Sequence, residues 1–169
     1  MSTLRGLTVL GIDPGLTVTG YGLVHAHGDY YEALDFGAIT PGSGLARPQR
    51  LECLFEALVS LIRTWKPDEA AVEDFIVGHV RAAVAVGEAR AIALLAAAQA
   101  GLPVSLYKPL EVKKFVTSYG RGSKEQVQEM VRALLGLPEP PQSADAADAL
   151  AVALCHCLRR SASLLEARP

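Results

Sequence analysis

Cysteine is scarce in this chain, with three residues among 169. An odd number without a framework spacing excludes a disulfide-stapled secreted scaffold and predicts reduced thiols in the cytoplasm. The run Cys155-His156-Cys157 does not predict a zinc site. Side chains two residues apart on a helix point about 200° apart, so the two thiols cannot easily bind one ion. We expect this run to pack in the core.

An excess of positive charge is also absent. The chain has 16 Lys and Arg residues against 18 Asp and Glu residues, and its formal net charge is −2. Composition alone therefore does not indicate a nucleic-acid-binding protein, and a polyanion would have to meet a local basic patch. Half of the residues are hydrophobic and a fifth are charged, which excludes disorder and predicts a compact globule.

The chain lacks a long apolar run without charges. The longest candidate, residues 82–102, is interrupted by Glu88 and Arg90 and is rich in alanine. This composition predicts a tightly packed helix of a soluble protein and not a membrane span. The small residues allow a neighbouring helix to approach closely, in the core or at a subunit interface. The opening residues 1–6 lead directly into a strand, so we expect no signal peptide.

The hydrophobic periodicity predicts a single domain over residues 1–160, followed by a flexible tail over 161–169. Three strands joined by short turns come first, and strands and helices then alternate. The expected strands are 7–12, 19–25, 30–39, 70–75 and 104–107, and the expected helices are 51–65, 82–102, 124–135 and one that contains Asp145 and Asp148. Ser123 and Gln126 form a capping box for the third helix. This order predicts an α/β fold with a five-stranded mixed sheet flanked by helices.

Two carboxylates stand out in the almost wholly apolar segment SADAADALAVALCHC. Asp145 and Asp148 are three residues apart, so they lie on the same face of a helix. Burying such a pair is costly unless a cation neutralises it. Aspartates in a first helical turn also interact favourably with the helix dipole, so capping is an alternative to metal binding.

Two further acids, Asp13 and Glu73, each end an expected strand. Strands that begin near residues 7 and 70 can lie adjacent and parallel, which would bring these two side chains together. Asp13 precedes Pro-Gly and could instead be an ordinary turn residue. The neighbour Asp74 should point to the opposite face of the sheet. We expect Asp68 and Glu69 to be solvated surface acids.

Four carboxylates without a His or thiolate cluster suit a hard cation such as Mg²⁺ or Mn²⁺. With two ions roughly 3.5–4 Å apart, one activates the attacking water and the other stabilises the leaving oxygen of a phosphodiester. Asp13 is the candidate to bridge both ions. Glu73, Asp145 and Asp148 would complete the sites.

A basic segment offers the complementary charge. Residues 108–124 contain five basic side chains and one acid, Glu111, so their net charge is +4. This concentration predicts phosphate contacts, although a solvated helical face is the alternative. The basic residues are Lys108, Lys113, Lys114, Arg121 and Lys124. Beyond Glu73, Phe75 could stack on an unpaired base or belong to the core, and His79 and Arg81 could contact DNA.

Several stretches of the chain closely resemble the RuvC family of bacterial Holliday junction resolvases. The resemblance extends from Val9 to about Leu158. It rests on VLGIDPGLTVTGYG, AVEDF, GEARAIALLAAA, VKKFVTSYGRGSKEQVQEMVRALLGLP and ADAADALAVALCH.

The resemblance implies an RNase H-like fold and a homodimer that cuts two opposing strands of a four-way DNA junction with one metal-dependent site per subunit. It assigns Asp13, Glu73, Asp145 and Asp148 to that site, although the third position varies in the family and is His in some members. It matches Lys113 and Lys124 to positions associated with DNA binding and catalysis. The RuvA–RuvB branch-migration complex is an implied partner.

Three alternatives stay open at this stage. A nucleotide-binding domain of the actin and sugar-kinase kind also begins with a Gly-Ile-Asp strand, but it normally needs two such domains. A related RNase H-like nuclease with another substrate, such as RNA, would use the same carboxylates. A catalytically silent junction-binding protein is the third alternative, and the presence of all four acids argues against it.

Overall fold

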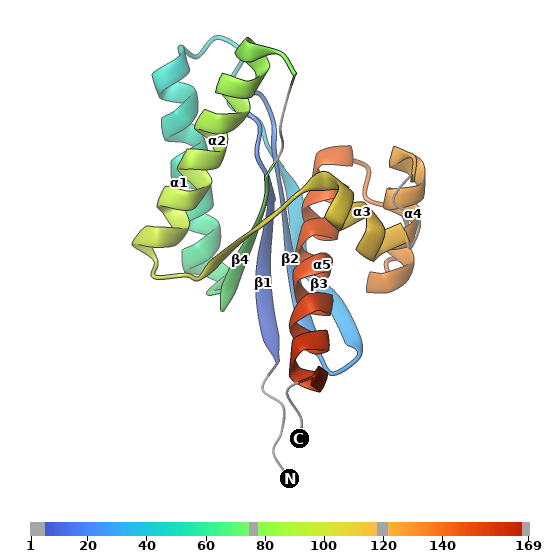
Figure 1. Cartoon of the computed structure of the whole chain (residues 1–169). Coiled ribbons are helices and arrows are strands. Elements are labelled where there is room, and N and C mark those ends of the chain that lie inside the picture. The colour runs from blue at the N-terminus through green and yellow to red at the C-terminus, as the bar shows by residue number, and fades with distance from the viewer. Residues whose placement is uncertain (1–5, 75–77, 118–121, 167–169) are drawn as a thin grey trace.

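A computed structural model describes residues 6–74, 78–117 and 122–166 of the chain. Five strands and five helices follow one another along the sequence (Figure 1). The strands are β1 (Leu7–Asp13), β2 (Thr19–His27), β3 (Tyr30–Ile39), β4 (Glu69–Glu73) and β5 (Val104–Tyr107). The helices are α1 (Arg47–Trp65), α2 (Val80–Gln99), α3 (Pro109–Thr117), α4 (Lys124–Leu135) and α5 (Ala144–Glu166).

The five strands form one mixed sheet in the order β3-β2-β1-β4-β5. The first three strands pair antiparallel, and the hairpin between β2 and β3 turns through Gly28, whose φ is 61°. Strands β4 and β5 run parallel to β1, because a helix separates each of them from the strand before it. The predicted α/β fold with a five-stranded mixed sheet is therefore confirmed.

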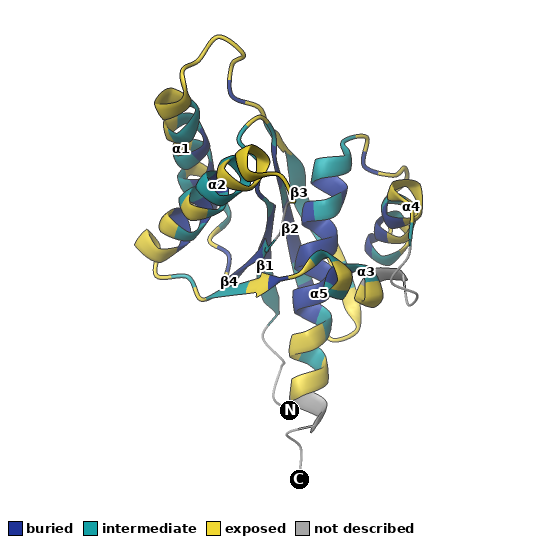
Figure 2. Cartoon of the chain, turned by 45° about the horizontal axis from the view of Figure 1, so that its top comes forward, coloured by how far each residue is buried: buried dark blue, intermediate teal, exposed yellow. Residues whose placement is uncertain are grey.

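Helices cover both faces of the sheet. Helices α1 and α2 pack together on one face, and α3, α4 and α5 lie on the other (Figure 1). Each interface contains its own apolar cluster: one surrounds Leu150 and Leu154 of α5, and the other surrounds Leu58 of α1 and Ala93 of α2. Most residues in the middle of α5 are buried (Figure 2). The described residues include no helix long and apolar enough to cross a membrane.

Helix α5 lies directly on the backbone of β1 and β2 because three strand positions lack a side chain. A Cβ atom at Gly11 would overlap with the carbonyl oxygen of Ala149, and one at Gly20 would overlap with the carbonyl oxygen of Asp145. A Cβ atom at Gly22 would lie 2.7 Å from the Leu150 side chain. Glycine in a strand allows such a close approach of another backbone. The first turns of α5 are therefore held against the sheet next to the end of β1.

Several local expectations are confirmed. Ser123 and Gln126 form the predicted capping box of α4, which ends at Leu135. Helix α1 ends at Trp65, with Lys66 in the left-handed region ahead of Pro67. Cys155 and Cys157 are buried, as predicted for core residues.

Two features of the helices were not predicted from the sequence. Helix α5 continues to Glu166, so the expected tail is helical up to that residue. The reason is that residues 161–166 contain no Gly or Pro, and the hydroxyls of Ser161 and Ser163 donate to carbonyls one turn back. Helix α3 was not among the elements expected from the sequence.

Candidate active site

The parallel register of the sheet brings two acids together. Ile12 of β1 pairs with Val72 of β4, so the next residues, Asp13 and Glu73, end neighbouring strands side by side. Their side chains share a hydrogen bond. Asp13 thus has a carboxyl partner, which the turn interpretation of Asp-Pro-Gly does not explain.

The first turns of α5 bring the other two acids to the same place. Gly20 pairs with Asp13 across the sheet, and the backbone of Asp145 lies against Gly20. The hydroxyl of Ser143 accepts a hydrogen bond from the backbone N–H of Ala146 at 3.3 Å and caps this helix end. The cap therefore does not depend on an aspartate. Asp145 and Asp148 remain directed by the helix toward the strand ends.

The pKa values record how closely these carboxylates are packed. Burial, the hydrogen bond with Glu73 and the charges of Glu73 and Asp145 raise the pKa of Asp13 to about 9. Burial and the charge of Asp148 also raise the pKa of Glu73. Burial and the charge of Asp13 raise the pKa of Asp148 to about 6. Near neutral pH the Asp13–Glu73 pair therefore retains a proton, because like charges this close cannot both ionise in a buried place.

Two lysines provide the opposing charge. Lys124, the first residue of α4, lowers the pKa values of Asp13 and Asp148. Lys113 of α3 lowers those of Glu73 and Asp148. The four acids and both lysines therefore lie within electrostatic reach of one another. In the sequence they are separated by up to 135 residues, from Asp13 to Asp148. The positive charge of the two lysines does not offset burial, since the pKa values of Asp13, Glu73 and Asp148 stay raised.

The acids next to Glu73 and at the start of β4 have other partners. Asp74 forms an ion pair with Arg90 of α2, which agrees with the prediction that it points away from Glu73. Glu69 was predicted to be a surface acid, and this was wrong. Its side chain is only 16% exposed and contacts His156 and Arg160 of α5. The sequence contains no local signal for these contacts, because the partners are 87 and 91 residues away.

The other predicted DNA-contacting residues are distributed over the surface. Lys108 and Lys114 are exposed at the start and near the end of α3, and His79 and Arg81 are exposed at the start of α2. Phe75 and Arg121 lie outside the described residues. Glycines 11, 20 and 22 were not predicted as site residues, although their spacing on facing strands is a signal for close backbone packing.

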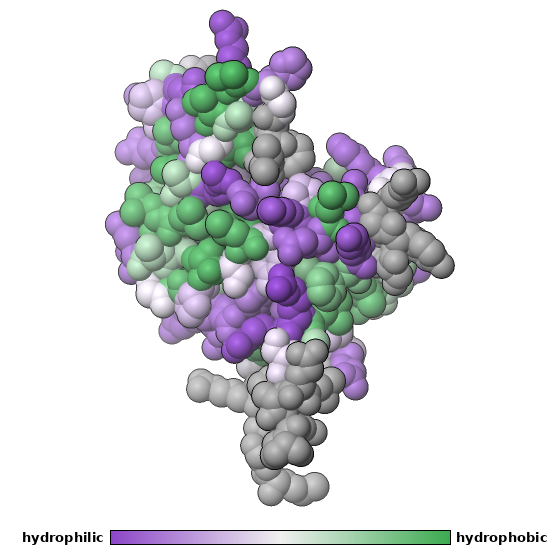
Figure 3. Space-filling model, in the orientation of Figure 1, coloured by the Kyte–Doolittle hydropathy of each residue, from purple (hydrophilic) through white to green (hydrophobic). Residues whose placement is uncertain are grey.

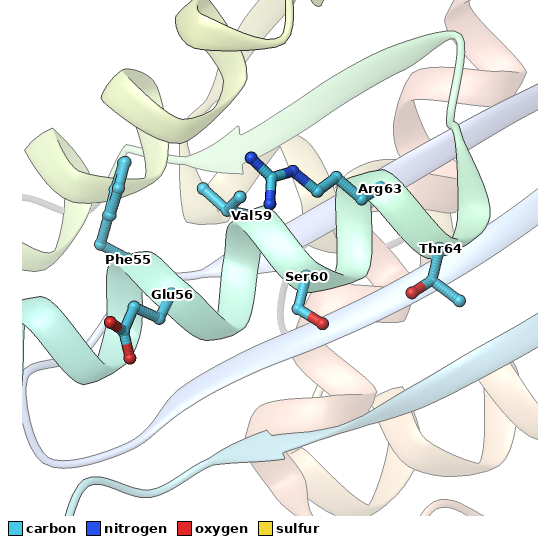
Figure 4. A pocket seen from close by; sticks show the side chains of 6 residues that line it. All are labelled: Phe55, Glu56, Val59, Ser60, Arg63 and Thr64. Atoms are coloured by element: carbon cyan, nitrogen blue, oxygen red, sulfur yellow. The ribbon is translucent and has the colours of Figure 1, made fainter.

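A hollow of about 340 Å³ lies elsewhere on the molecule, on the outer side of α1 (Figure 4). All six lining side chains belong to that one helix, and they are Phe55, Glu56, Val59, Ser60, Arg63 and Thr64. None of them is a predicted site residue. The chemistry of the four acids is therefore separate from this hollow.

Comparison with known proteins identifies the family. The family model described as crossover junction endodeoxyribonuclease RuvC matches residues 9–156. The chain belongs to the RuvC family. It is 49% identical to the crossover junction endodeoxyribonuclease RuvC of Rubrobacter xylanophilus over 164 residues, covering 95% of this chain and 92% of the relative. It is 52% identical to the RuvC of Trichlorobacter lovleyi over 151 residues, covering 89% and 84% of the two chains.

The structural comparison agrees with the RuvC assignment. The structure of T. thermophilus RuvC in complex with a Holliday junction substrate matches with a TM-score of 0.87 and 33% identity, over 93% of this chain and 96% of that one. This match confirms the RNase H-like fold that the sequence resemblance implied. This member of the family is an endodeoxyribonuclease that acts at DNA crossover junctions.

Proposed function

We propose that this protein resolves four-way DNA junctions by metal-dependent phosphodiester hydrolysis at Asp13, Glu73, Asp145 and Asp148. The observation that carries the proposal is the convergence of two strand ends and one helix start, which packs carboxylates closely enough to raise their pKa values. Such an arrangement destabilises the free protein, because buried like charges repel. A divalent cation removes that cost.

The donor set fits Mg²⁺ or Mn²⁺. All four candidate ligands are carboxylates, and hard divalent cations prefer oxygen donors. In the part of the chain that the structure describes, no three acidic, His or Cys side chains already form a complete ligand group. Two bound ions would supply a nucleophilic hydroxide and stabilise the leaving oxygen.

The protein's own side chains have distinct tasks in this proposal. Asp13 lies centrally, against Glu73 on one side and close to Asp145 and Asp148 on the other, so it is the candidate to bridge two ions. Lys124 is exposed beside the acids and can neutralise charge that develops on the phosphate. Lys113 can hold a neighbouring phosphate against the same site.

The basic segment supports a path for the DNA backbone. Lys108 directly precedes helix α3, which carries Lys113 and Lys114, and helix α4 starts at Lys124. Phosphates bind favourably to helix N-termini and to clustered lysines. We extend this path to Arg121, and to His79 and Arg81 at the start of α2. Phe75 is the proposed stacking residue.

A homodimer is part of the proposal, because paired incision needs two sites. Helix α2 exposes apolar side chains: Val80 is 80% exposed, Val84 48% and Leu95 49%. Apolar side chains gather over the α1–α2 side of the molecule (Figure 3). Exposed apolar patches of this kind mark association surfaces. The RuvA–RuvB complex is the further partner that we expect from family membership.

The decisive experiment compares cleavage of a synthetic four-way junction, a linear duplex and an RNA–DNA hybrid with Mg²⁺, Mn²⁺ or EDTA. We expect symmetric nicks in the junction alone, lost in EDTA. Asp13→Asn and Glu73→Gln should abolish cleavage and still bind the junction in EDTA, because both keep the side-chain size. Glu52→Gln, the same acid-to-amide change at an exposed residue of α1 outside the site, serves as the matched control. Preferential cutting of the hybrid would move the protein to another nuclease class, and cleavage by Asp13→Asn would refute the site.

A further inference from the structure

A chain of buried polar contacts ties α5 to the two strands at the far edge of the sheet. The side chain of His156 is only 3% exposed. Its Nε2 atom lies 2.5 Å from the Glu69 carboxylate, at the start of β4, and its Nδ1 atom lies 2.8 Å from the Tyr107 hydroxyl, at the end of β5. A carboxylate only accepts hydrogen bonds, so Nε2 carries the proton.

Each end of this polar chain is held in turn. Arg160 lies 3.0 Å from the other oxygen of Glu69. The Arg159 guanidinium lies 5.5 Å from the centre of the Tyr107 ring, a distance at which it is attracted to the ring. His156 therefore has both ring nitrogens bound to anchored partners on two different strands.

The polar chain leads back to the candidate site by two routes. His156 lies on α5, eight residues after Asp148, or about 12 Å along a helix. Tyr107 pairs with Glu73 in the sheet, and its carbonyl oxygen accepts a hydrogen bond from the N–H of Asp74 at 2.7 Å. The same contacts thus touch two of the three elements that supply the acids, the strand end of β4 and the helix α5.

We propose that His156 is a positioning residue, which fixes where α5 sits along β4 and β5 and thereby aligns Asp145 and Asp148 with Glu73. This inference rests on the proposed function of those acids. Apolar contacts are not directional, so they hold α5 against the sheet but resist sliding weakly. The two hydrogen bonds between the His156 ring and residues of two strands are directional. Because a helix is rigid, they also fix the position of its first turns.

The alternative is that His156 contributes only to stability, since a buried unpaired polar group is costly in any fold. The two roles differ in a measurable way. Lost stability lowers the folded fraction but leaves each folded molecule fully active. Lost alignment slows cleavage of bound junction and weakens metal binding, even when every molecule is folded.

The test uses full-length variants well below their unfolding temperatures. Tyr107→Phe removes only the hydroxyl and keeps the ring, and His156→Leu removes both hydrogen bonds. Glu69→Gln keeps an oxygen that can accept from Nε2 and is the conservative variant, with Glu69→Ala as its disruptive counterpart. Cys157→Ala is the control, because it truncates a buried side chain on the same turn of α5 without breaking these hydrogen bonds.

Two readouts are needed. The first is the single-turnover cleavage rate of junction that is fully bound, as a function of Mg²⁺ concentration. We expect His156→Leu and Tyr107→Phe to cut about 10–100-fold more slowly, the range that misplaced supporting residues cause. The second is the rise in unfolding temperature on adding Mg²⁺ without DNA, which should shrink in both variants. Glu69→Gln and Cys157→Ala should behave like the wild type in both.

Wild-type cleavage and Mg²⁺ dependence in Tyr107→Phe and His156→Leu would overturn the positioning role, whatever their stability. If His156→Leu does not fold, Tyr107→Phe alone decides between the outcomes. An Asp13→Asn protein is measured in parallel. If it is inactive while the His156 and Tyr107 variants cut normally, only the positioning role fails. If it cuts the junction, the proposed site fails, and the positioning role fails with it.

Discussion

Replacing Asp148 with Asn should stabilise the metal-free protein and at the same time abolish its activity. The carboxyl of Asp148 is forced close to Asp13, and burial and that charge raise its pKa from 3.8 to about 6. A raised pKa means that the fold prefers the protonated, neutral acid. Asn resembles the neutral acid in size and removes the repulsion.

The magnitude follows from the shift of the pKa. A difference of about two pKa units corresponds to about 3 kcal/mol. Asp148 is only partly buried, so solvent screening reduces this to about 1–2 kcal/mol. For a chain of this length, each kcal/mol moves the unfolding temperature by about 2–4 °C. We therefore expect Asp148→Asn to unfold about 2–8 °C higher than the wild type at pH 8 without metal.

The sign of the pH dependence is a stricter test than the magnitude. Below pH 3.8 Asp148 is protonated in both the folded and unfolded states, so the variant and wild type should be equally stable. As pH rises from 3.8 to about 6, the unfolded state loses its proton first and the wild type loses stability relative to the variant. Above that range the difference should stay constant.

The assay is thermal or urea unfolding in EDTA across pH 4–8, repeated with Mg²⁺. Glu52→Gln, a change at an exposed acid of α1, is the matched control and should leave stability almost unchanged at every pH. Mg²⁺ should stabilise the wild type, by about 2.7 kcal/mol at a hundred times its dissociation constant, and stabilise Asp148→Asn much less. An Asn variant that is less stable than wild type at pH 8, or equally altered at pH 4, would refute the repulsion argument.

Three other changes test the site, the charge beside it and the association surface. Gly20→Ala should lower the free energy of unfolding and reduce cleavage, because its Cβ atom overlaps with the Asp145 carbonyl oxygen and pushes α5 away; normal cleavage with normal stability would contradict this packing. Lys124→Ala should slow cleavage of bound junction about 100-fold at low and high salt alike, by losing charge beside the acids; unchanged rates would exclude Lys124 from the chemistry. Leu95→Glu should convert a dimer near twice 17.9 kDa into a monomer in light scattering without unfolding it; a dimer that persists would exclude the α2 face as the interface.

Local signals predicted most of the fold. The capping box at Ser123 and Gln126, the end of α1 at Trp65 and the short turn between β2 and β3 all depend on contacts within about four residues. The alternation of strands and helices after β3 predicted parallel pairing of β1 and β4. That pairing was enough to predict that Asp13 and Glu73 would lie together.

The sequence by itself also determined which residue types could bind a cation, since four carboxylates occur at element ends without competing His or thiolate clusters. Only the tertiary structure decided that Glu69 contacts His156, that Asp74 forms an ion pair with Arg90, and that α5 packs on glycines of β1 and β2. The physical reason is distance along the chain. Glu69 and His156 are 87 residues apart, and no turn, cap or periodicity extends that far. Such partners meet only after sheet register and helix packing have brought their backbones together.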